Sequence, residues 1–199
     1  FGWQIGPATA SLPGCCGLNG DPSSDFTPTS DNGVAGVVIG GDYPLSSYYQ
    51  QPYLWLTSPA LNTLSDQGGA FDTVTLEFRR WLNSDYPPYI TNAIQVQRGF
   101  LWYDLWVQPN DGQLMTDSAW TLIELDLTPY RSSYTQLRWG YNQGSTGVFA
   151  AGGWNIDDVF VTGTPAVVNE PSSIVSTAAG VLLMLTAWVR RRRSLPLLR

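Results

Sequence analysis

The stretch Gly152-Gly153-Trp154-Asn155-Ile156-Asp157-Asp158-Val159-Phe160-Val161-Thr162-Gly163 reads as a buried β-strand that carries two adjacent carboxylates at its centre. Its glycine ends and its aromatic and β-branched residues are typical of a strand. Strict alternation puts Asp158 on the same face as Trp154 and Phe160, and Asp157 on the opposite face. Unpaired charges are not left in a core, so each acid needs a partner. We therefore expect only one of the two acids to contact a loop or a cation, and no side-by-side catalytic pair.

The rest of the chain supplies further strand candidates and no amphipathic helix. Twenty Gly and fourteen Pro provide turns, and nine Trp, ten Tyr and seven Phe give a heavy aromatic load. This composition predicts an all-β fold, a two-sheet antiparallel β-sandwich of jelly-roll type, in which residues 1–33 form a turn-rich loop. Apolar runs or period-two alternation predict strands at seven further segments: 34–40, 53–57, 73–82, 92–98, 100–107, 120–127 and 134–141.

The charged residues exclude several classes of function. The chain has no His, and all ten of its basic residues are Arg. Ser-His-Asp and Cys-His nucleophiles, His-bound zinc and a Schiff-base lysine are therefore ruled out. Residues 1–168 hold five Arg against fifteen Asp and Glu, a formal charge of −10. An acidic body of this kind argues against nucleic acid as a partner and is compatible with calcium.

The only two cysteines, Cys15 and Cys16, are neighbours in the sequence. Neighbouring cysteines can bond to each other only through a strained ring, so a structural disulfide framework is absent. Three states stay open for this pair: free thiols, a disulfide between the two neighbours, and a bond to another chain.

The composition changes after Gly163. A linker at 164–173 precedes an uncharged, apolar run at 174–189, which is closed by Arg190, Arg191, Arg192 and Arg193. A run that is apolar on all sides with a cationic end predicts a membrane helix whose Arg end is cytoplasmic. The sequence thus divides into a β-sandwich domain at 1–163, the linker, and a transmembrane helix with an Arg-rich tail at 174–199.

This tail resembles the PEP-CTERM sorting signal of exported bacterial proteins. In that family a Pro-Glu-Pro tripeptide precedes a short hydrophobic helix and an Arg-rich end; here the tripeptide position reads Asn169-Glu170-Pro171. The resemblance implies export, anchoring in the inner membrane before processing, and removal of the tail near Pro171 by an exosortase-type enzyme. The mature protein would then lie at the cell surface or outside the cell.

The body resembles a MAM-like jelly-roll domain, a type of module that occurs on extracellular proteins. The similarity covers roughly residues 3–163, and Phe26 stands where the family favours His. It rests on short segments that occur in the family's order: Ser24-Asp25-Phe26-Thr27, Asp31-Asn32-Gly33, Leu56-Thr57-Ser58-Pro59, Thr75-Leu76-Glu77-Phe78, Arg80-Trp81-Leu82, Leu137-Arg138-Trp139-Gly140 and the segment 153–159.

Related jelly rolls bring the N-terminal acidic loop and the last strand together at one end of the sandwich, in some cases around a structural calcium ion. Carried over by position, this resemblance implies metal ligands at Asp25, Asp31, and Asp157 or Asp158. Carboxylates far apart in sequence come close without repulsion when they share a cation. The alternative is that these acids hydrogen-bond to loop amides and turn the backbone.

Three functions follow from these patterns. The first is a non-catalytic binding or adhesion module, exported and held at the cell surface or in the matrix. The second is a carbohydrate-binding module whose aromatic rings stack on a sugar, against the alternative that most of these rings pack in the core. Trp102 and Trp106 share strand parity and Tyr103 points to the other face; the full set of candidate rings is Tyr48, Tyr49, Trp55, Trp102, Tyr103 and Trp106. The third is an accessory domain of a larger secreted hydrolase. Catalysis itself is not expected, because Glu77 and Glu124 are the only glutamates of the body and both are predicted to point outward.

Overall fold

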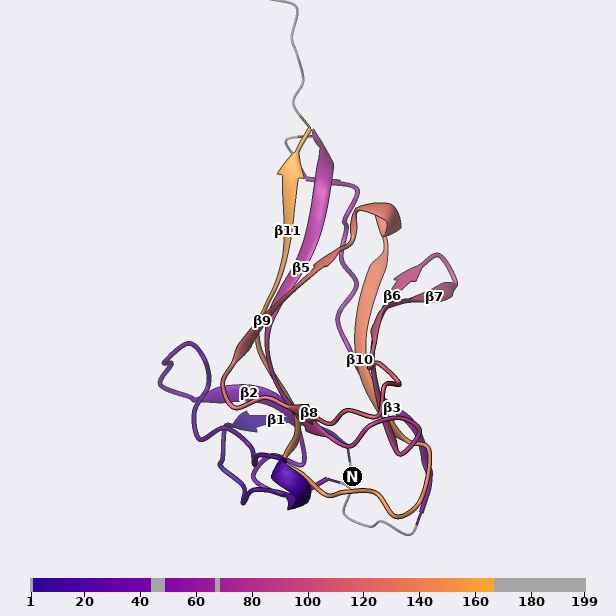
Figure 1. Cartoon of the computed structure of the whole chain (residues 1–199). Helices are drawn as coiled ribbons and strands as arrows, with labels where there is room; N and C mark the ends of the chain where they lie inside the picture. Colours follow the sequence, from indigo (N-terminus) through magenta and orange to yellow (C-terminus); the bar gives the residue numbers. More distant parts are fainter. Residues whose placement is uncertain (1, 44–48, 67–68, 167–199) are drawn as a thin grey trace, which may run out of the picture. The chain divides into compact units, whose positions relative to one another are not determined.

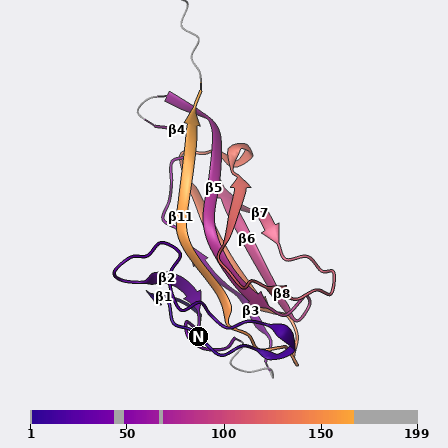
Figure 2. The same ribbon diagram turned by 60° about the vertical axis from the view of Figure 1, so that its left-hand side comes forward.

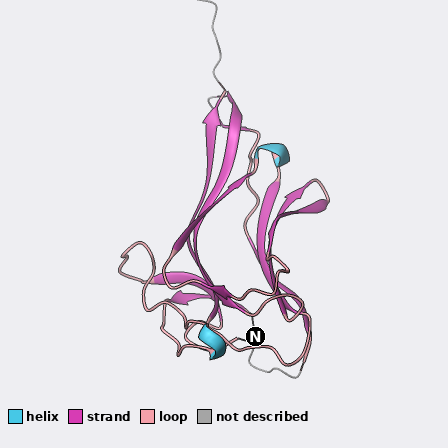
Figure 3. Ribbon diagram, viewed as in Figure 1, coloured by secondary structure: helices cyan, strands magenta, loops and turns pink. Residues whose placement is uncertain are grey.

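The computed structural model describes residues 2–43, 49–66 and 69–166 of the 199-residue chain. These residues form two antiparallel sheets that pack face to face, which confirms the predicted all-β sandwich (Figures 1 and 3). The helical elements among them are two 3-10 turns, Cys15–Gly17 and Thr128–Tyr130, and no helix of these parts is long and apolar enough to cross a membrane. The expected helix at 174–189 and the sorting residues lie outside the described residues.

The larger sheet is built around two long strands, β5 (Gly69–Ser84) and β11 (Gly153–Pro165), that lie side by side (Figure 2). Its order is β1-β2-β11-β5-β4, and β8 and β9 also pair with β5. The strands of this sheet are β1 (Trp3–Pro7), β2 (Gly33–Val37), β4 (Ser65–Asp66), β5 (Gly69–Ser84), β8 (Met115–Thr116), β9 (Thr121–Asp126) and β11 (Gly153–Pro165).

The smaller sheet has four strands in the order β3-β10-β6-β7. They are β3 (Gln51–Thr57), β6 (Ile90–Arg98), β7 (Leu101–Val107) and β10 (Thr135–Gln143). All eight predicted strands are present. The expectation of a loop over 1–33 is wrong at both ends, because Trp3–Pro7 and Gly33 pair as strands. The Gly and Pro that close Trp3–Pro7 made this segment look like a turn.

The hydrophobic core fills the space between the sheets. The predicted inward faces are confirmed: Leu137 and Trp139 of β10 are almost fully buried, and Ile123 and Leu125 of β9 pack against the core. Phe78 meets the Trp139 ring edge to face, at 5.8 Å between centroids. Large buried rings of this kind dominate the energetics of a core.

The predicted alternation along the last strand is interrupted at its two acids. Trp154 and Ile156 point into the core as expected, but Asp158 has a left-handed backbone (φ 47°) and the register with β5 shifts between Asp157 and Phe160. Phe160 therefore pairs with Glu77 on the outer face and is 57% exposed. A β-bulge inserts an extra residue, so each later side chain of the strand points to the face opposite to the one that strict alternation predicts.

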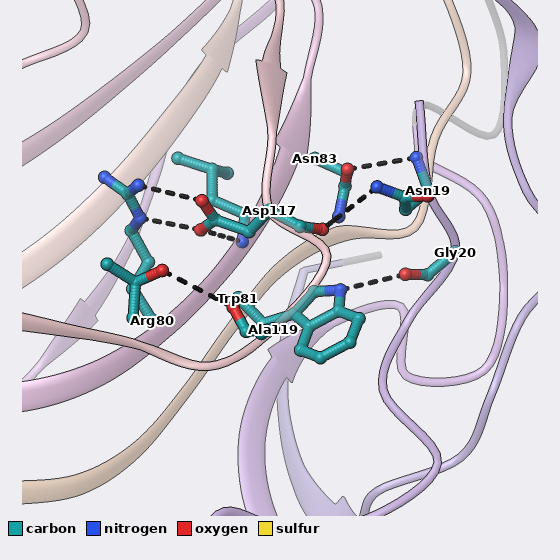
Figure 4. A network of polar contacts seen from close by, with 9 residues as sticks. Asn19, Gly20, Arg80, Trp81, Asn83, Asp117 and Ala119 are labelled. Carbon is teal, nitrogen blue, oxygen red and sulfur yellow. Dashed lines mark hydrogen bonds and ion pairs between the residues drawn. The ribbon is translucent and has the colours of Figure 1, made fainter. Parts of the chain in front are cut away.

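A polar cluster fastens the N-terminal loop to the larger sheet (Figure 4). The Asp117 carboxylate accepts hydrogen bonds from Arg80 Nε (2.9 Å), Arg80 Nη2 (3.0 Å) and the Leu82 amide (2.9 Å). The Asp117 carbonyl accepts from the side-chain amides of Asn83 (3.0 Å) and Asn19 (3.2 Å). The side chains of Arg80 and Asp117 are only 13% and 11% exposed, so each charge depends on the other.

The substitution Asp117→Ala should therefore lower the free energy of unfolding by about 3 kcal/mol and Tm by about 8 °C, because it leaves the mostly buried Arg80 guanidinium without its ion-pair partner. Thermal melting followed by circular dichroism measures the effect. Asp111→Ala, which removes an exposed loop acid, is the matched control and should change little. Equal losses in the two variants would contradict the assigned role of Asp117.

Candidate functional site

The four predicted metal ligands lie where the acidic loop meets β11. Two of them gather around one hydroxyl: the Thr29 side chain contacts the carboxylates of both Asp25 and Asp31, the latter at 2.7 Å. The other two hold the loop through its backbone and side chain. Asp157 Oδ2 accepts from the Phe26 amide at 2.8 Å, and Asp158 Oδ2 accepts from the Thr27 hydroxyl.

The expected contact between the acidic loop and the last strand is thus confirmed, but the expectation that only one acid makes it is wrong. The bulge at Asp158 removes the parity constraint, so both acids face the loop. No group of three or more acidic, Cys or His side chains among the described residues is arranged to hold a metal ion. The four carboxylates accept hydrogen bonds from neutral amides and hydroxyls, as the hydrogen-bonding alternative expects. The calcium ion stays a prediction.

Asp21, from the same loop, makes a third and more deeply buried contact with β11. Its Oδ1 accepts from the Asn155 side-chain amide at 2.6 Å, and its Oδ2 accepts from the Gly40 amide at 2.8 Å. Burial raises the pKa of Asp21 to about 7; these two hydrogen bonds oppose the rise, and the nearby Asp42 charge adds to it. A carboxyl with no cationic partner in a dry site favours its neutral form.

A different surface, the outer face of the four-stranded sheet, gathers aromatic rings around one guanidinium. Tyr53 and Trp55 of β3 stack at 4.7 Å with an interplanar angle of 17°. The Arg138 guanidinium carbon of β10 lies 4.0 Å from the Trp55 ring centre and 3.9 Å from that of Trp102 on β7. We call this surface, with Tyr53, Trp55, Trp102 and Arg138, the stacking face. All four side chains are partly exposed.

Strand register explains why these side chains meet. Arg138, Gln95 and Asp104 form one row across β10, β6 and β7. Gln95 Oε1 accepts from Arg138 Nε at 2.8 Å, and Gln95 Nε2 donates to Asp104 Oδ1 at 2.6 Å. Gly140, the cross-strand partner of Trp55, has no side chain, and a Cβ there would overlap the Trp55 ring. The ring therefore lies directly against the backbone of β10.

Electrostatics on the stacking face is balanced. Partial burial lowers the pKa of Arg138, and the Asp104 carboxylate opposes that change. Burial, and secondarily the Asp104 charge, raises the pKa of Tyr53. The guanidinium keeps its charge, since an arginine pKa stays far above neutrality. One cation and one anion linked by an amide thus leave this face with polar groups and little net charge.

The two tryptophans predicted to stack together on a ligand are separated by the sheet. Trp102 pairs with Gln97 and belongs to the stacking face. Trp106 pairs with Ile94, packs against the core and meets Trp154 edge to face at 6.1 Å. The expectation that they share a face is wrong, because the register of β7 shifts between Asp104 and Trp106.

The remaining acid pair, Glu77 and Glu124, is directly opposed across β5 and β9 on the outer face of the larger sheet. Both point outward, as predicted. Glu124, with Asp126, borders an open depression of about 470 Å³, and Glu77 does not line it. These two glutamates therefore do not flank a common cleft.

A scan against protein-family models gave no match to this chain, and a search of curated protein sequences gave none either. Among solved structures, the chain is similar to the CBM22-1 xylan-binding domain of Paenibacillus barcinonensis Xyn10C, with 11% identity and a TM-score of 0.34. The alignment covers 83% of this chain and 88% of that domain.

Sequence reasoning found one member of the stacking face, Trp102, and grouped it with the wrong partner. It considered Trp55 as one of several aromatic candidates and gave Arg138 no role. A signal for both was present: Trp55 and Arg138 each alternate with inward apolar residues, Leu54 and Leu137, on strands of the same sheet. Neither sequence segment alone shows that the strands of Trp55 and Arg138 are neighbours in the sheet.

The raised pKa of Asp21 predicts a pH dependence of stability. The stabilising, neutral form of Asp21 is fully populated below its unfolded pKa, and its contribution is lost as pH rises through about 7. The wild-type chain should therefore melt several degrees lower at about pH 8.5 than at about pH 5.5, and Asp21→Asn should flatten this slope. Thermal melts across that range provide the measurement, and a variant with the slope of the wild type would contradict the assignment.

Proposed function

We propose that this chain is an exported, non-catalytic binding module that recognises a neutral polysaccharide through the stacking face of its four-stranded sheet. The single observation that carries the proposal is the Arg138 guanidinium held between the rings of Trp55 and Trp102. We include in the proposal that the sandwich is a jelly roll of MAM-like type.

Aromatic and arginine side chains supply the apolar part of such a site. The C–H faces of a pyranose pack on aromatic rings, and Trp, Tyr and Arg are the residues that dominate binding surfaces. Rings that are already stacked on one another lose little conformational freedom when a ligand arrives. Tyr53 and Trp55 stack on each other, Trp102 packs on the Arg138 guanidinium, and all three are still partly exposed.

The polar neighbours of the rings support a glycan over an apolar ligand. Hydroxyl groups of sugars both donate and accept hydrogen bonds, and Gln95, Asp104 and Arg138 present both kinds of atom on one surface. The linked charges of Arg138 and Asp104 favour a neutral chain over a charged one. The body charge of −10 also disfavours an anionic polysaccharide.

The absence of catalysis is part of the proposal. The chain has no His and no Lys, and its two body glutamates lie on the outer face of the other sheet. A two-carboxylate hydrolase needs acids on either side of a bound glycosidic bond. The stacking face carries one carboxylate, Asp104, which is hydrogen-bonded to Gln95.

Export and surface location rest on the tail. Asn169-Glu170-Pro171, the apolar run at 174–189 and Arg190 to Arg193 resemble a PEP-CTERM signal, and the proposal is that an exosortase-type enzyme releases the body from the inner membrane. A binding module at the cell surface or in the matrix then acts by holding polysaccharide or a neighbouring surface protein.

Truncation of the stack should weaken glycan binding without unfolding the domain. Trp55→Ala and Arg138→Ala should each weaken binding about 10-fold or more in affinity electrophoresis against xylan, mixed-linkage glucan and mannan, because each removes a desolvated central contact. Phe160→Ala, which removes an exposed ring from the other sheet, is the matched control and should bind as the wild type does.

Gly140→Ala gives an independent check, because the added methyl group displaces the Trp55 ring while every polar group of the face is retained. Weaker binding with an unchanged circular dichroism spectrum is expected. The proposal would be overturned if none of the neutral polysaccharides retained the wild-type chain, or if they retained Trp55→Ala as strongly as the wild type.

The sorting proposal makes a separate prediction about the tail. In a bacterial host with an exosortase, the mature protein should be shorter than the precursor, with a new C-terminus near Pro171 in mass spectrometry. Glu170→Ala should retain the precursor in the inner membrane. Replacing Glu124, which has the same chemistry but lies on β9, should leave processing intact. An uncleaved, secreted chain would contradict the processing step.

A further inference from the structure

A cleft of about 670 Å³ opens between the two sheets, on the side where β1, β2 and β11 face β3 and β10. Its inner wall is made by the core residues Leu137 and Trp139 of β10 and Ile156 of β11. Leu56 of β3 and Leu61 line it on the same side as β10, and Val159 and Val161 line it from β11. Partly exposed apolar side chains therefore flank the buried core at this edge, on a different part of the molecule from the stacking face.

The strand that borders this cleft has an unpaired edge. β11 pairs with β2 only through Asn155 and Ile156, whereas on its other side it pairs with β5 as far as Pro165. Beyond Ile156, no strand in the described parts of the chain pairs with the β2 side of β11. Val159 and Val161 of this stretch line the cleft, and Val159 is 44% exposed. An open strand edge is a template for another strand.

The rim of the cleft is acidic. Asp31, Asp157 and Asp158 all line it. Their hydrogen-bond donors are backbone amides and threonine hydroxyls, and the one ion pair in the described residues is Arg80 with Asp117. Three carboxylates without a cationic partner complement a basic residue.

We propose that this cleft binds an extended peptide segment of a partner protein, which adds a strand to the free edge of β11. Its backbone bonds to residues 158–165, its alternate apolar side chains enter the cleft beside Val159 and Val161, and an Arg or Lys at one end meets Asp157 and Asp158. Strand addition gains affinity from main-chain hydrogen bonds and specificity from pockets for alternate side chains. A helix or a small molecule would leave the edge of β11 unsatisfied.

The test uses the full 199-residue chain and a fluorescein-labelled probe peptide, Arg-Thr-Val-Thr-Val-Thr-Val, whose length of about seven residues matches a strand. The control peptide has Pro in place of its central Val, which removes a donor and disfavours strand pairing. Fluorescence anisotropy should give a Kd below about 100 µM for the probe and at least about 10-fold weaker binding for the control. Hydrogen exchange should show new protection of those amides at 159–164 that point away from β5.

Variants localise the effect. Val161→Asp places a charge on the cleft wall and should weaken binding about 10-fold or more, whereas Thr162→Asp, one residue along and on the outer face, should change it less than about 2-fold. Val161→Thr keeps the shape of Val161 and serves if the aspartate variant fails to fold. Asp31→Asn should weaken binding about 2-fold to 5-fold at low salt, with Glu124→Gln as the control.

Three outcomes would overturn the proposal. The first is no binding of the probe by a folded chain. The second is binding that leaves the outward-edge amides of 159–164, those that point away from β5, unprotected, or that Thr162→Asp weakens as much as Val161→Asp does. The third is protection of these edge amides before any peptide is added. Protection that rises with protein concentration would then assign the edge to a second copy, and protection independent of concentration would assign it to the chain's own tail.

The glycan proposal is tested separately by the same variants. Trp55→Ala should leave peptide binding unchanged, and Val161→Asp should leave polysaccharide binding unchanged, because the two surfaces lie on opposite sides of the four-stranded sheet. Loss of one activity alone therefore identifies which proposal has failed.

Discussion

The long antiparallel pairing between β5 and β11, and the single bulge within it, set most of the features of this domain. The pairing runs from Gly153 to Pro165 and is interrupted only around Asp157 to Phe160 and at its far end. One extra residue with a left-handed backbone at Asp158 lets both acids reach the N-terminal loop. Beyond the bulge β11 no longer has β2 beside it. The loop contact, the exposed Phe160 and the open edge of the cleft are thus linked to one local irregularity, because a bulge bends and twists its strand.

The acidic loop illustrates how the protein accommodates an excess of carboxylates without cations. Asp25, Asp31, Asp157 and Asp158 accept hydrogen bonds from amides and hydroxyls. Asp21 is buried against β11, and this burial raises its pKa to about 7. Arg80 of the larger sheet, whose side chain is 13% exposed, is matched to Asp117.

Two outward surfaces with different chemistry follow from the same sandwich. The four-stranded sheet presents rings and one guanidinium on its solvent side, and Gly140 provides the space in which the Trp55 ring lies flat. The cleft between the sheets presents partly exposed apolar side chains, an unpaired strand edge and an acidic rim. Stacking suits a polysaccharide, and strand pairing suits a peptide, so one small domain offers a basis for joining the two.

Composition and alternation alone determined the all-β class, the eight principal strands and the inward faces of β9 and β10, because burial on one face of a strand imposes period two on the sequence itself. They did not determine the strand Trp3–Pro7, the partner of Trp102, or the positions of Asp158 and Phe160. Those depend on which strands are neighbours and on where a residue is added to one of them. Register and bulges are settled by contacts between segments far apart in the chain, such as Arg138 with Gln95 or Phe26 with Asp157, and no single segment carries that information.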